Sequence, residues 1–311
     1  MADKKRRPQG RDDAGRNAGS PSPARGRAAS DRANGASARP KRIAPQSAAP
    51  QRDASGGTRR DRRADAPQVL YIEGRRAVAE AIAARFPVRR ALVVAGQRDA
   101  GTAEFVQALK AAGTPIDRVS REELDAISSH GAHQGIALEV GRFPYRDITE
   151  VIAASGTGPA LVVVLDHVTD EGNLGAIARS AEVAGASGLV IANRRAAGVG
   201  VGTFKTSAGA VLHLPIAQVP NLVRAIDQLK EAGFWVVGAS EHAEETCWDA
   251  PLDGRVALVM GSEGEGLSRL VRERCDLLVK LPQRGVTESL NVAQAATVLC
   301  YEWMRRTWGE A

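Results

Sequence analysis

Three closely spaced glycines that follow an apolar segment form a pattern suited to binding a ligand. Gly261, Gly264 and Gly266 follow residues 256–260 (VALVM) in the order GxxGxG. Glycine adopts positive φ angles at low cost and lets a backbone approach a ligand closely, so this loop is suited to binding a small molecule; an ordinary turn is the alternative. The order differs from the GxGxxG of dinucleotide-binding folds. Neither GxxxxGK[ST] nor GxSxG occurs, which disfavours a phosphate-binding-loop triphosphatase and an α/β-hydrolase.

Histidines and cysteines do not follow the spacing of a metal site. His130 and His133 lie close to Gly131 in a segment that we expect to be a hydrogen-bonding turn. The cysteines show neither CxxC nor CxxH spacing: Cys247, Cys275 and Cys300. We therefore expect no bound metal and no disulfide, and instead three buried thiols in a reducing compartment.

A site at the glycine loop needs neighbouring strands that bring other loops to it. Two further apolar segments, 161–165 (LVVVL) and 277–281 (LLVKL), are typical of strands buried on both faces of a parallel sheet. After the first, apolar residues recur at helical spacing up to a strand at 189–192, which completes a βαβ unit; they are Leu174, Ile177, Ala178, Ala181 and Ala184. Parallel sheets bind ligands at the carboxyl ends of their strands. The pattern predicts an α/β enzyme with a small-ligand crevice at that edge.

A smaller α/β unit is expected before this sheet, at residues 68–141. Its helices are predicted at 74–85, at 101–112 and from a capping box at Ser120 and Glu123 to Ile127, with strands at 91–95, 116–119 and 135–140. A Pro- and Gly-containing linker at 142–159 separates it from residues 160–311, which are numerous enough for a core of their own.

Residues 1–66 differ from the rest in composition. They hold 17 Lys and Arg against 7 Asp and Glu, no aromatic residue, and only Ile43 among Val, Ile and Leu. Such a segment buries too little apolar surface to offset its ordering entropy, so we expect a disordered basic tail. It either attracts phosphate backbones or is only a solubilising extension. Acidic residues interrupt its charge, which disfavours a transit peptide, and the sequence shows no secretory or membrane-spanning segment. We therefore expect a soluble, cytoplasmic protein.

Three segments resemble, in order and spacing, the motifs of the SpoU (TrmH-like) branch of the SPOUT RNA 2′-O-ribose methyltransferases. They are 173–181 (NLGAIARSA), 259–267 (VMGSEGEGL) and 281–295 (LPQRGVTESLNVAQA). Residues 205–222 (KTSAGAVLHLPIAQVPNL), 71–78 and 133–136 (HQGI) are similar, more narrowly, to bacterial enzymes that methylate a guanosine ribose in 23S rRNA. The resemblance covers about residues 68–308 and leaves out the tail.

This resemblance implies a SPOUT-type parallel-sheet catalytic domain with a C-terminal trefoil knot, between about Val256 and Trp303, although knots are nearly absent from proteins in general. It implies a homodimer, and S-adenosylmethionine as the methyl donor. A sulfonium is already an electrophile, so no metal is needed. For the cofactor we expect backbone and apolar contacts at Gly261, Leu281 and Leu290, with Ser289 beside them, because adenine sits well between aliphatic side chains and main-chain groups.

The same resemblance makes Arg179 the residue that activates the ribose hydroxyl. A guanidinium stays protonated, so we expect Arg179 to bind an adjacent RNA phosphate and stabilise the developing alkoxide while a phosphate oxygen or water accepts the proton. Asn173 is implied to orient Arg179 or the ribose, Glu263 to position Asn173 or the substrate, and Ser289 and Asn291 to face cofactor and substrate. Helix caps for the asparagines and Ser289, a turn carboxylate and a surface arginine are the structural alternatives.

Structured RNA is the expected partner. The extra amino-terminal domain and the SAGA segment at 207–210 favour 23S rRNA, and a guanosine of tRNA is the alternative. Phosphate contacts are expected on the small domain, although ordinary solvated charges would explain the same residues: Arg75, Arg76, Arg89 and Arg90. A non-catalytic RNA-binding module is disfavoured because all five motif side chains are present, and a Rossmann methyltransferase or dehydrogenase is disfavoured by the glycine order.

Overall fold

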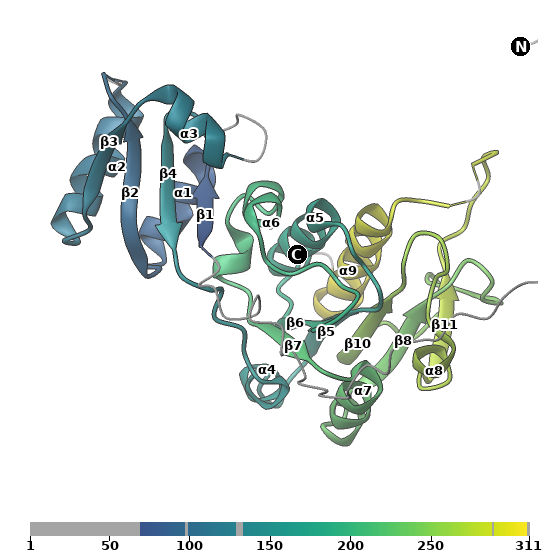
Figure 1. The fold of residues 1–311 in the computed structure, drawn as a ribbon. Helices are drawn as coiled ribbons and strands as arrows, with labels where there is room; N and C mark the ends of the chain where they lie inside the picture. The colour runs from purple at the N-terminus through teal and green to yellow at the C-terminus, as the bar shows by residue number, and fades with distance from the viewer. Residues whose placement is uncertain (1–68, 97–98, 129–132, 288, 310–311) are drawn as a thin grey trace, which may run out of the picture. The chain divides into compact units, whose positions relative to one another are not determined.

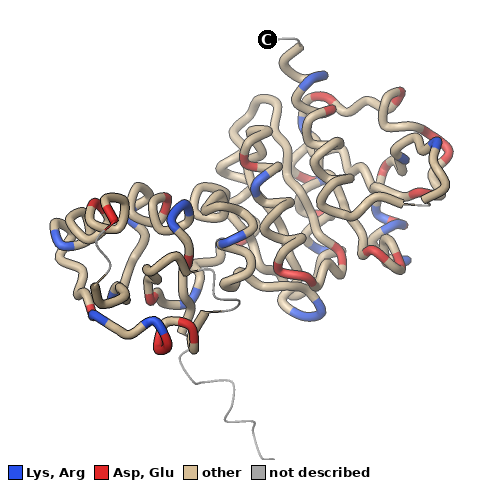
Figure 2. Tube along the Cα trace, turned by 90° about the horizontal axis from the view of Figure 1, so that it is seen from above, with Lys and Arg blue, Asp and Glu red and all other residues tan. Residues whose placement is uncertain are grey.

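The structure, a computed structural model, describes residues 69–96, 99–128, 133–287 and 289–309, which form two sheets (Figure 1). The tail expected at 1–66 and the loop histidine His130 lie outside the described residues. Basic and acidic residues are interspersed along the described trace (Figure 2). This mixture is expected because residues 67–311 hold 25 basic and 29 acidic residues.

The first sheet has four strands in the order β1-β4-β2-β3. They are β1 (Leu70–Glu73), β2 (Val88–Val94), β3 (Ile116–Val119) and β4 (Ile136–Val140). Strand β4 is antiparallel to β1 and β2, while β2 is parallel to β3. The helices are α1 (Arg75–Ala83), α2 (Ala100–Ala111) and α3 (Arg121–Ile127). The predicted capping box is present, because Ser120 and Glu123 exchange hydrogen bonds at the start of α3.

The second sheet has seven strands, all parallel, in the order β7-β6-β5-β10-β8-β11-β9. They are β5 (Ala160–Leu165), β6 (Gly188–Ala192), β7 (Ile216–Val219), β8 (Trp235–Ala239), β9 (Glu245–Thr246), β10 (Arg255–Met260) and β11 (Leu277–Lys280). Every residue of β5 is buried, as its continuous apolar run predicts for a strand covered on both faces. The parallel α/β sheet is confirmed; the knot stays a prediction.

Helices cover both faces of this sheet and build one apolar cluster on each side (Figure 1). One face carries α5 (Glu171–Val183), α6 (Val201–Thr206), the 3-10 helix η2 (Ala210–Leu212) and α9 (Val292–Trp308); the other carries α4 (Ile148–Ala154), α7 (Leu222–Glu231) and α8 (Arg269–Arg272). Helices α5 and α6 pack closely at Gly175, where an added Cβ would lie 2.0 Å from Oγ1 of Thr206. The motif glycine is therefore required by packing.

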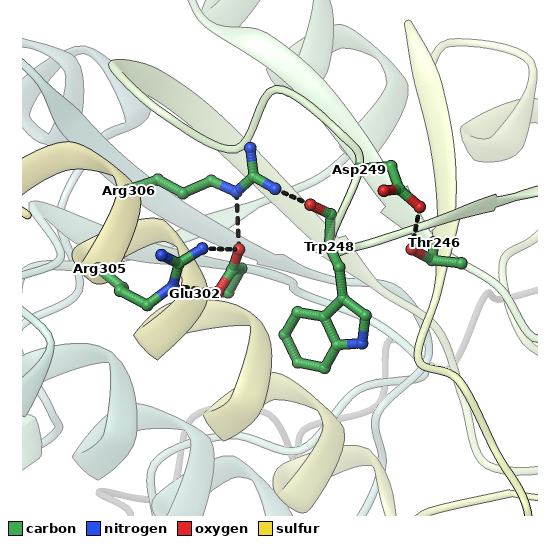
Figure 3. A network of polar contacts seen from close by, with 6 residues as sticks. All are labelled: Thr246, Trp248, Asp249, Glu302, Arg305 and Arg306. Carbon is green, nitrogen blue, oxygen red and sulfur yellow. Dashed lines mark hydrogen bonds and ion pairs between the residues drawn. The ribbon is translucent and has the colours of Figure 1, made fainter.

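The last turns of α9 are fixed to a loop by one buried carboxylate (Figure 3). Glu302 is 5% exposed and accepts hydrogen bonds from Arg305 (2.8 and 2.9 Å) and Arg306 (2.6 Å). Arg306 also donates to the carbonyl of Trp248. The hydrogen bond from Arg305, with a weaker one from Arg306, holds the pKa of Glu302 below its ordinary value against the effect of burial. This network anchors α9, whose other end reaches the site described below.

The segment expected as a linker, 142–159, is largely folded. Helix α4 starts at a capping box formed by Asp147 and Glu150. Phe143 is buried, and its ring centroid lies 5.0 Å from that of Tyr145 and 6.3 Å from that of Phe204. The contact with Phe204 attaches the first half of the segment to α6.

Two of the small-domain arginines expected to bind phosphate are held by carboxylates instead. Arg75 lies 2.6 Å from Asp99, and Arg90 pairs with Asp117 at 2.8 Å and Glu139 at 2.7 Å. Hydrogen bonds to Glu139 and then Asp117 raise the pKa of Arg90. Arg76 and Arg89 are exposed, and they remain the candidates for phosphate contact on this domain.

Candidate active site

Helix α5 begins directly behind β5, at the carboxyl edge of the sheet. Asp170 is its N-cap and accepts a 2.7 Å hydrogen bond from the backbone N–H of Asn173. The alternative in which Asn173 caps this helix is therefore wrong: it is the third helical residue, and its side chain is free to act elsewhere. The sequence does not single out Asp170 because Thr169, Asp170 and Asn173 all suit an N-cap.

The glycine loop after β10 folds back on itself. Ser262 and Gly266 form a bridge with N–H to O distances of 3.1 and 3.0 Å. A Cβ at Gly261 would lie 2.2 Å from the carbonyl carbon of Gly266, so only glycine fits there. Gly266 has a φ of +65°, which also favours glycine. The tight turn projects Glu263 from its tip into an exposed position.

Helix α9 begins at Val292, with Asn291 as its N-cap. The side-chain oxygen of Asn291 accepts hydrogen bonds from the backbone N–H groups of Ala293 (2.9 Å) and Gln294 (3.4 Å). The cap alternative is thus correct for Asn291, and Ser289 lies outside the helix. Because the cap uses only the oxygen, the amide nitrogen of Asn291 can donate to other groups.

Three motif side chains from three separate elements form one hydrogen-bonded network. Asn173 donates to Oε1 of Glu263 at 3.0 Å. Asn291 donates to the same oxygen at 2.5 Å and to Oδ1 of Asn173 at 3.0 Å. The network joins α5, the glycine loop and α9. Both of these hydrogen bonds to Glu263 use Oε1; within the described ranges Oε2 has no hydrogen-bond donor, so this oxygen can accept from a substrate or cofactor.

A pocket opens beside the network at the carboxyl ends of β10, β8 and β11. Its lining includes all four residues expected at the cofactor: Gly261, Leu281, Ser289 and Leu290. Glu263 also lines it. Leu290 is 46% exposed and lies at a cavity wall that includes Met260, Val292 and Leu299. The mixture of aliphatic side chains and main-chain groups fits an adenosine-containing ligand.

Sequence analysis missed one wall of this pocket. Residues 239–242 (ASEH), which follow β8, line it. Strand β8 lies between β10 and β11. The loop after β8 therefore lies between the two predicted loops that follow β10 and β11. The sequence signal of β8 is weak because Gly238 interrupts its apolar run. The serine, glutamate and histidine behind an apolar segment were the available clue.

Arg179 is not part of the network within this chain. It lies on α5, exposed, six residues beyond Asn173. Six residues correspond to about 600° of helical rotation, so the two side chains leave the helix about 120° apart. Its position on the open surface of α5 leaves its guanidinium available to a second macromolecule.

The described ranges hold neither a candidate metal cluster nor a helix that could span a membrane. They contain no cluster of three or more His, Cys, Asp or Glu able to hold a metal ion. They likewise contain no helix that is long and apolar enough to cross a bilayer. Cys247 and Cys300 are buried and Cys275 is half-buried, so that one of the three thiols departs from the expectation. Burial raises the pKa of Cys247 to about 11 and the pKa of both other thiols to about 12.

Both folded parts match models of known families. Residues 160–301 match the SpoU rRNA Methylase family, and residues 71–146 match a domain described as RNA 2′-O ribose methyltransferase substrate binding. A Bacillus subtilis protein described as a putative TrmH family tRNA/rRNA methyltransferase is 36% identical over 238 residues, 76% of this chain and 95% of its own. A Mycolicibacterium smegmatis protein described as an uncharacterized tRNA/rRNA methyltransferase is 39% identical over 251 residues, 80% of this chain and 79% of its own.

Solved structures agree with these relatives. The SpoU methyltransferase AviRb from Streptomyces viridochromogenes, determined in complex with AdoMet, is 27% identical with a TM-score of 0.67 and covers 76% of this chain and 90% of its own. An AdoMet-bound rRNA methyltransferase from Sinorhizobium meliloti is 25% identical with a TM-score of 0.65, covering 76% and 87%. The glycine loop and the network lie in the three motif segments, which also include parts of the capped helices α5 and α9. Together with these relatives they show that this chain belongs to the SpoU rRNA methylase family.

Proposed function

We propose that this protein methylates a ribose 2′-hydroxyl of a guanosine in 23S rRNA. The broader activity follows from the family: it is an S-adenosylmethionine-dependent RNA methyltransferase. The observation that supports transfer to a ribose hydroxyl is the network of Asn173, Glu263 and Asn291, which borders the pocket at its Glu263 end; the choice of a guanosine in 23S rRNA rests on the motif resemblance. The domain that matches a 2′-O-ribose substrate-binding model supports transfer to a ribose independently.

The cofactor fits the pocket through Gly261, Leu281, Ser289 and Leu290. S-adenosylmethionine supplies an activated methyl group, so no metal is needed to make the electrophile. The aliphatic wall excludes water, and the loops after β10, β8 and β11 present main-chain donors and acceptors. Holding two reacting groups at attack distance is worth about 7 to 11 kcal/mol of the barrier.

Glu263 and the two asparagines position the nucleophile in this proposal. Oε1 of Glu263 is occupied by two amide donors, so the carboxylate is fixed in orientation. Oε2 accepts the hydrogen bond of the ribose hydroxyl and aligns its oxygen with the methyl group. Arg179 binds an RNA phosphate and stabilises the alkoxide as the proton leaves to a phosphate oxygen or water. The proposal includes a homodimer. In it, the exposed Arg179 acts at the active site of its own protomer or at that of the partner.

The deciding experiment compares RNA substrates and maps the product. Purified protein is incubated with radiolabelled S-adenosylmethionine and either unmodified 23S rRNA or unmodified bulk tRNA, and 2′-O-methylation is mapped by resistance to alkaline cleavage. We expect one protected guanosine in 23S rRNA. Incorporation confined to tRNA would favour the tRNA alternative, and incorporation that leaves every 2′-hydroxyl cleavable would refute ribose methylation. Mapping total RNA with and without the gene provides the matching test in cells.

A further inference from the structure

The loop after β6, residues 193–199, lies at the same carboxyl edge as the active site but on its far side. The strand order at this edge is β6, β5, β10, β8, β11. The pocket is formed over β10, β8 and β11, and the network joins the loop after β10 to the helix after β5. Loop 193–199 is therefore separated from the pocket by the network. An RNA strand that lies across this carboxyl edge with its target ribose at Glu263 reaches loop 193–199 with its flanking nucleotides.

Hydrogen bonds hold the loop in a fixed conformation. The N–H of Ala197 donates to the carbonyl of Val168 at 2.8 Å, which links the loop to the one after β5. The N–H of Val199 donates to the hydroxyl of Tyr145 at 2.7 Å. Arg195 has a φ of +56°, a left-handed backbone conformation that residues other than glycine rarely adopt. A surface arginine held in this way points to a functional constraint.

A second strained residue lies in the adjoining loop after β5. His167 has a φ of +59°, and its Nδ1 is 2.7 Å from Oδ1 of Asp166. Asp166 is 1% exposed, and its other oxygen accepts from the N–H of Ser268 at 2.7 Å. His167 itself is 43% exposed. Two neighbouring loops thus use strained backbone to present basic side chains at one edge.

Arg194 and Arg195 are exposed and make no ion pair or side-chain hydrogen bond within the described part of the chain. The acidic residues of the neighbouring loop are already engaged, Asp170 with the N–H of Asn173 and Glu171 with the N–H of Gly202. Arg255 of the same domain, by contrast, is held by two carbonyls and a serine. Two exposed guanidinium groups on consecutive residues are suited to donate hydrogen bonds to phosphate oxygens.

We propose that loop 193–199 binds the RNA backbone beside the target ribose, with Arg194 and Arg195 contacting phosphates of the flanking nucleotides. This inference rests on the proposed function, because it uses the target ribose at Glu263 as its reference point. It assigns the side of the active site opposite the pocket to the RNA strand. The contacts are to phosphate, so they orient the substrate without reading its sequence.

The test measures RNA binding separately from methyl transfer. Full-length protein carrying Arg194→Gln and Arg195→Gln is compared with wild type and with a control carrying Arg269→Gln and Arg274→Gln. The control removes the same charge from exposed arginines that pair with Glu273 and Asp227 beside the other face of the sheet. Binding of a fluorescent single-stranded RNA of mixed sequence is followed by anisotropy from 50 to 300 mM salt, and S-adenosylmethionine binding by calorimetry. The basic tail contributes equally to all three proteins.

We expect the loop variant to bind RNA about tenfold more weakly at 100 mM salt, with a log–log salt slope smaller by about 1.5, because two phosphate contacts are lost. Cofactor affinity stays unchanged, and the control behaves like wild type. An equal loss in both variants, or an unchanged slope in the loop variant, overturns the proposal. Loss of cofactor affinity in the loop variant also overturns it. If wild type binds RNA with the predicted difference but methylates no ribose, the proposed function fails while the RNA surface stands.

Discussion

Asn291 donates a 2.5 Å hydrogen bond to Glu263 with the same side chain whose oxygen caps α9. Two substitutions separate these roles, because aspartate caps a helix as well as asparagine does and alanine does not. Asn291→Asp keeps the cap but places a carboxylate against Glu263. Asn291→Ala loses both, at a cost of about 1 kcal/mol for the cap.

We expect Asn291→Asp to lose methyl transfer by about a hundredfold, since the displaced carboxylate no longer aligns the nucleophile. Repulsion raises the pKa of one of the two carboxyl groups in the folded variant, so its stability deficit is present above the ordinary carboxyl pKa and disappears as the pH falls below it. Urea unfolding at pH 8 and pH 4 measures this. A deficit that is the same at both pH values would contradict the assigned contact.

The cofactor pocket is tested by Leu290→Arg with Val286→Arg as its control. Both residues belong to the loop before α9, but Leu290 lines the pocket while Val286 is fully exposed and does not. We expect Leu290→Arg to abolish detectable S-adenosylmethionine binding in calorimetry, because a cation then faces a cationic ligand. Val286→Arg should bind like wild type. Equal affinity in the two variants would place the cofactor elsewhere.

Arg179 is expected to act on RNA and not on the cofactor. Arg179→Ala should bind S-adenosylmethionine with unchanged affinity and lose methyl transfer by about 10² to 10³-fold, the range for removing one donor to a developing oxyanion. Arg179→Lys should recover little, because a lysine cannot bind phosphate bidentately. Single-turnover rates at saturating RNA are the measurement. Near-normal turnover of the alanine variant would remove Arg179 from the mechanism.

Gly209 and Gly233 provide a matched pair for the contact between α1 and η2. Both have positive φ, +93° and +82°. A Cβ at Gly209 would lie 2.5 Å from the Cβ of Glu80, whereas Gly233 has no atom within 4 Å. We expect Gly233→Ala to cost about 1 kcal/mol of unfolding free energy, from backbone strain alone, and Gly209→Ala at least twice that. Equal costs in chemical denaturation would mean that this contact gives way freely.

Cys300 should make stability fall at alkaline pH. Burial raises the pKa of its thiol to about 12 from 9.0, so the folded state keeps a proton that the unfolded chain loses. The stabilising effect is complete below pH 9 and is lost progressively towards pH 12. Compared with Cys300→Ala, wild type should lose about 1.4 kcal/mol more between pH 8 and pH 10. Parallel curves for the two proteins would show that this thiol does not cause the effect.

The sequence was sufficient for elements with strong local signals. The uninterrupted apolar run of β5 and the capping box at Ser120 appear where the pattern indicates. The order of the strands could not be predicted from the sequence. Tertiary packing inserts β8 between β10 and β11, and Gly238 breaks the apolar run of β8. For the same reason the pocket wall at 239–242 was missed.

The candidate site divides in the same way. Motif resemblance selected Asn173, Glu263 and Asn291, but their mutual hydrogen bonds depend on three chain turns that no local pattern encodes. The alternative of an Asn173 cap lay about one turn too late on α5, because Asp170 and Asn173 are equally good N-cap residues. The pairing of Arg75 and Arg90 with carboxylates likewise depends on neighbouring strands and loops.

The network also has a consequence for the timing of biosynthesis. Asn173 is translated 118 residues before Asn291, which at about 5 to 20 residues per second is a delay of roughly 6 to 24 seconds. Throughout that interval the nascent chain already carries β5 and α5 but lacks the residue that closes the network. Helix α9, which covers one face of the sheet, is also still missing. The network is therefore completed only after Asn291 has been made, and a nascent chain that ends before this residue lacks one of its three members.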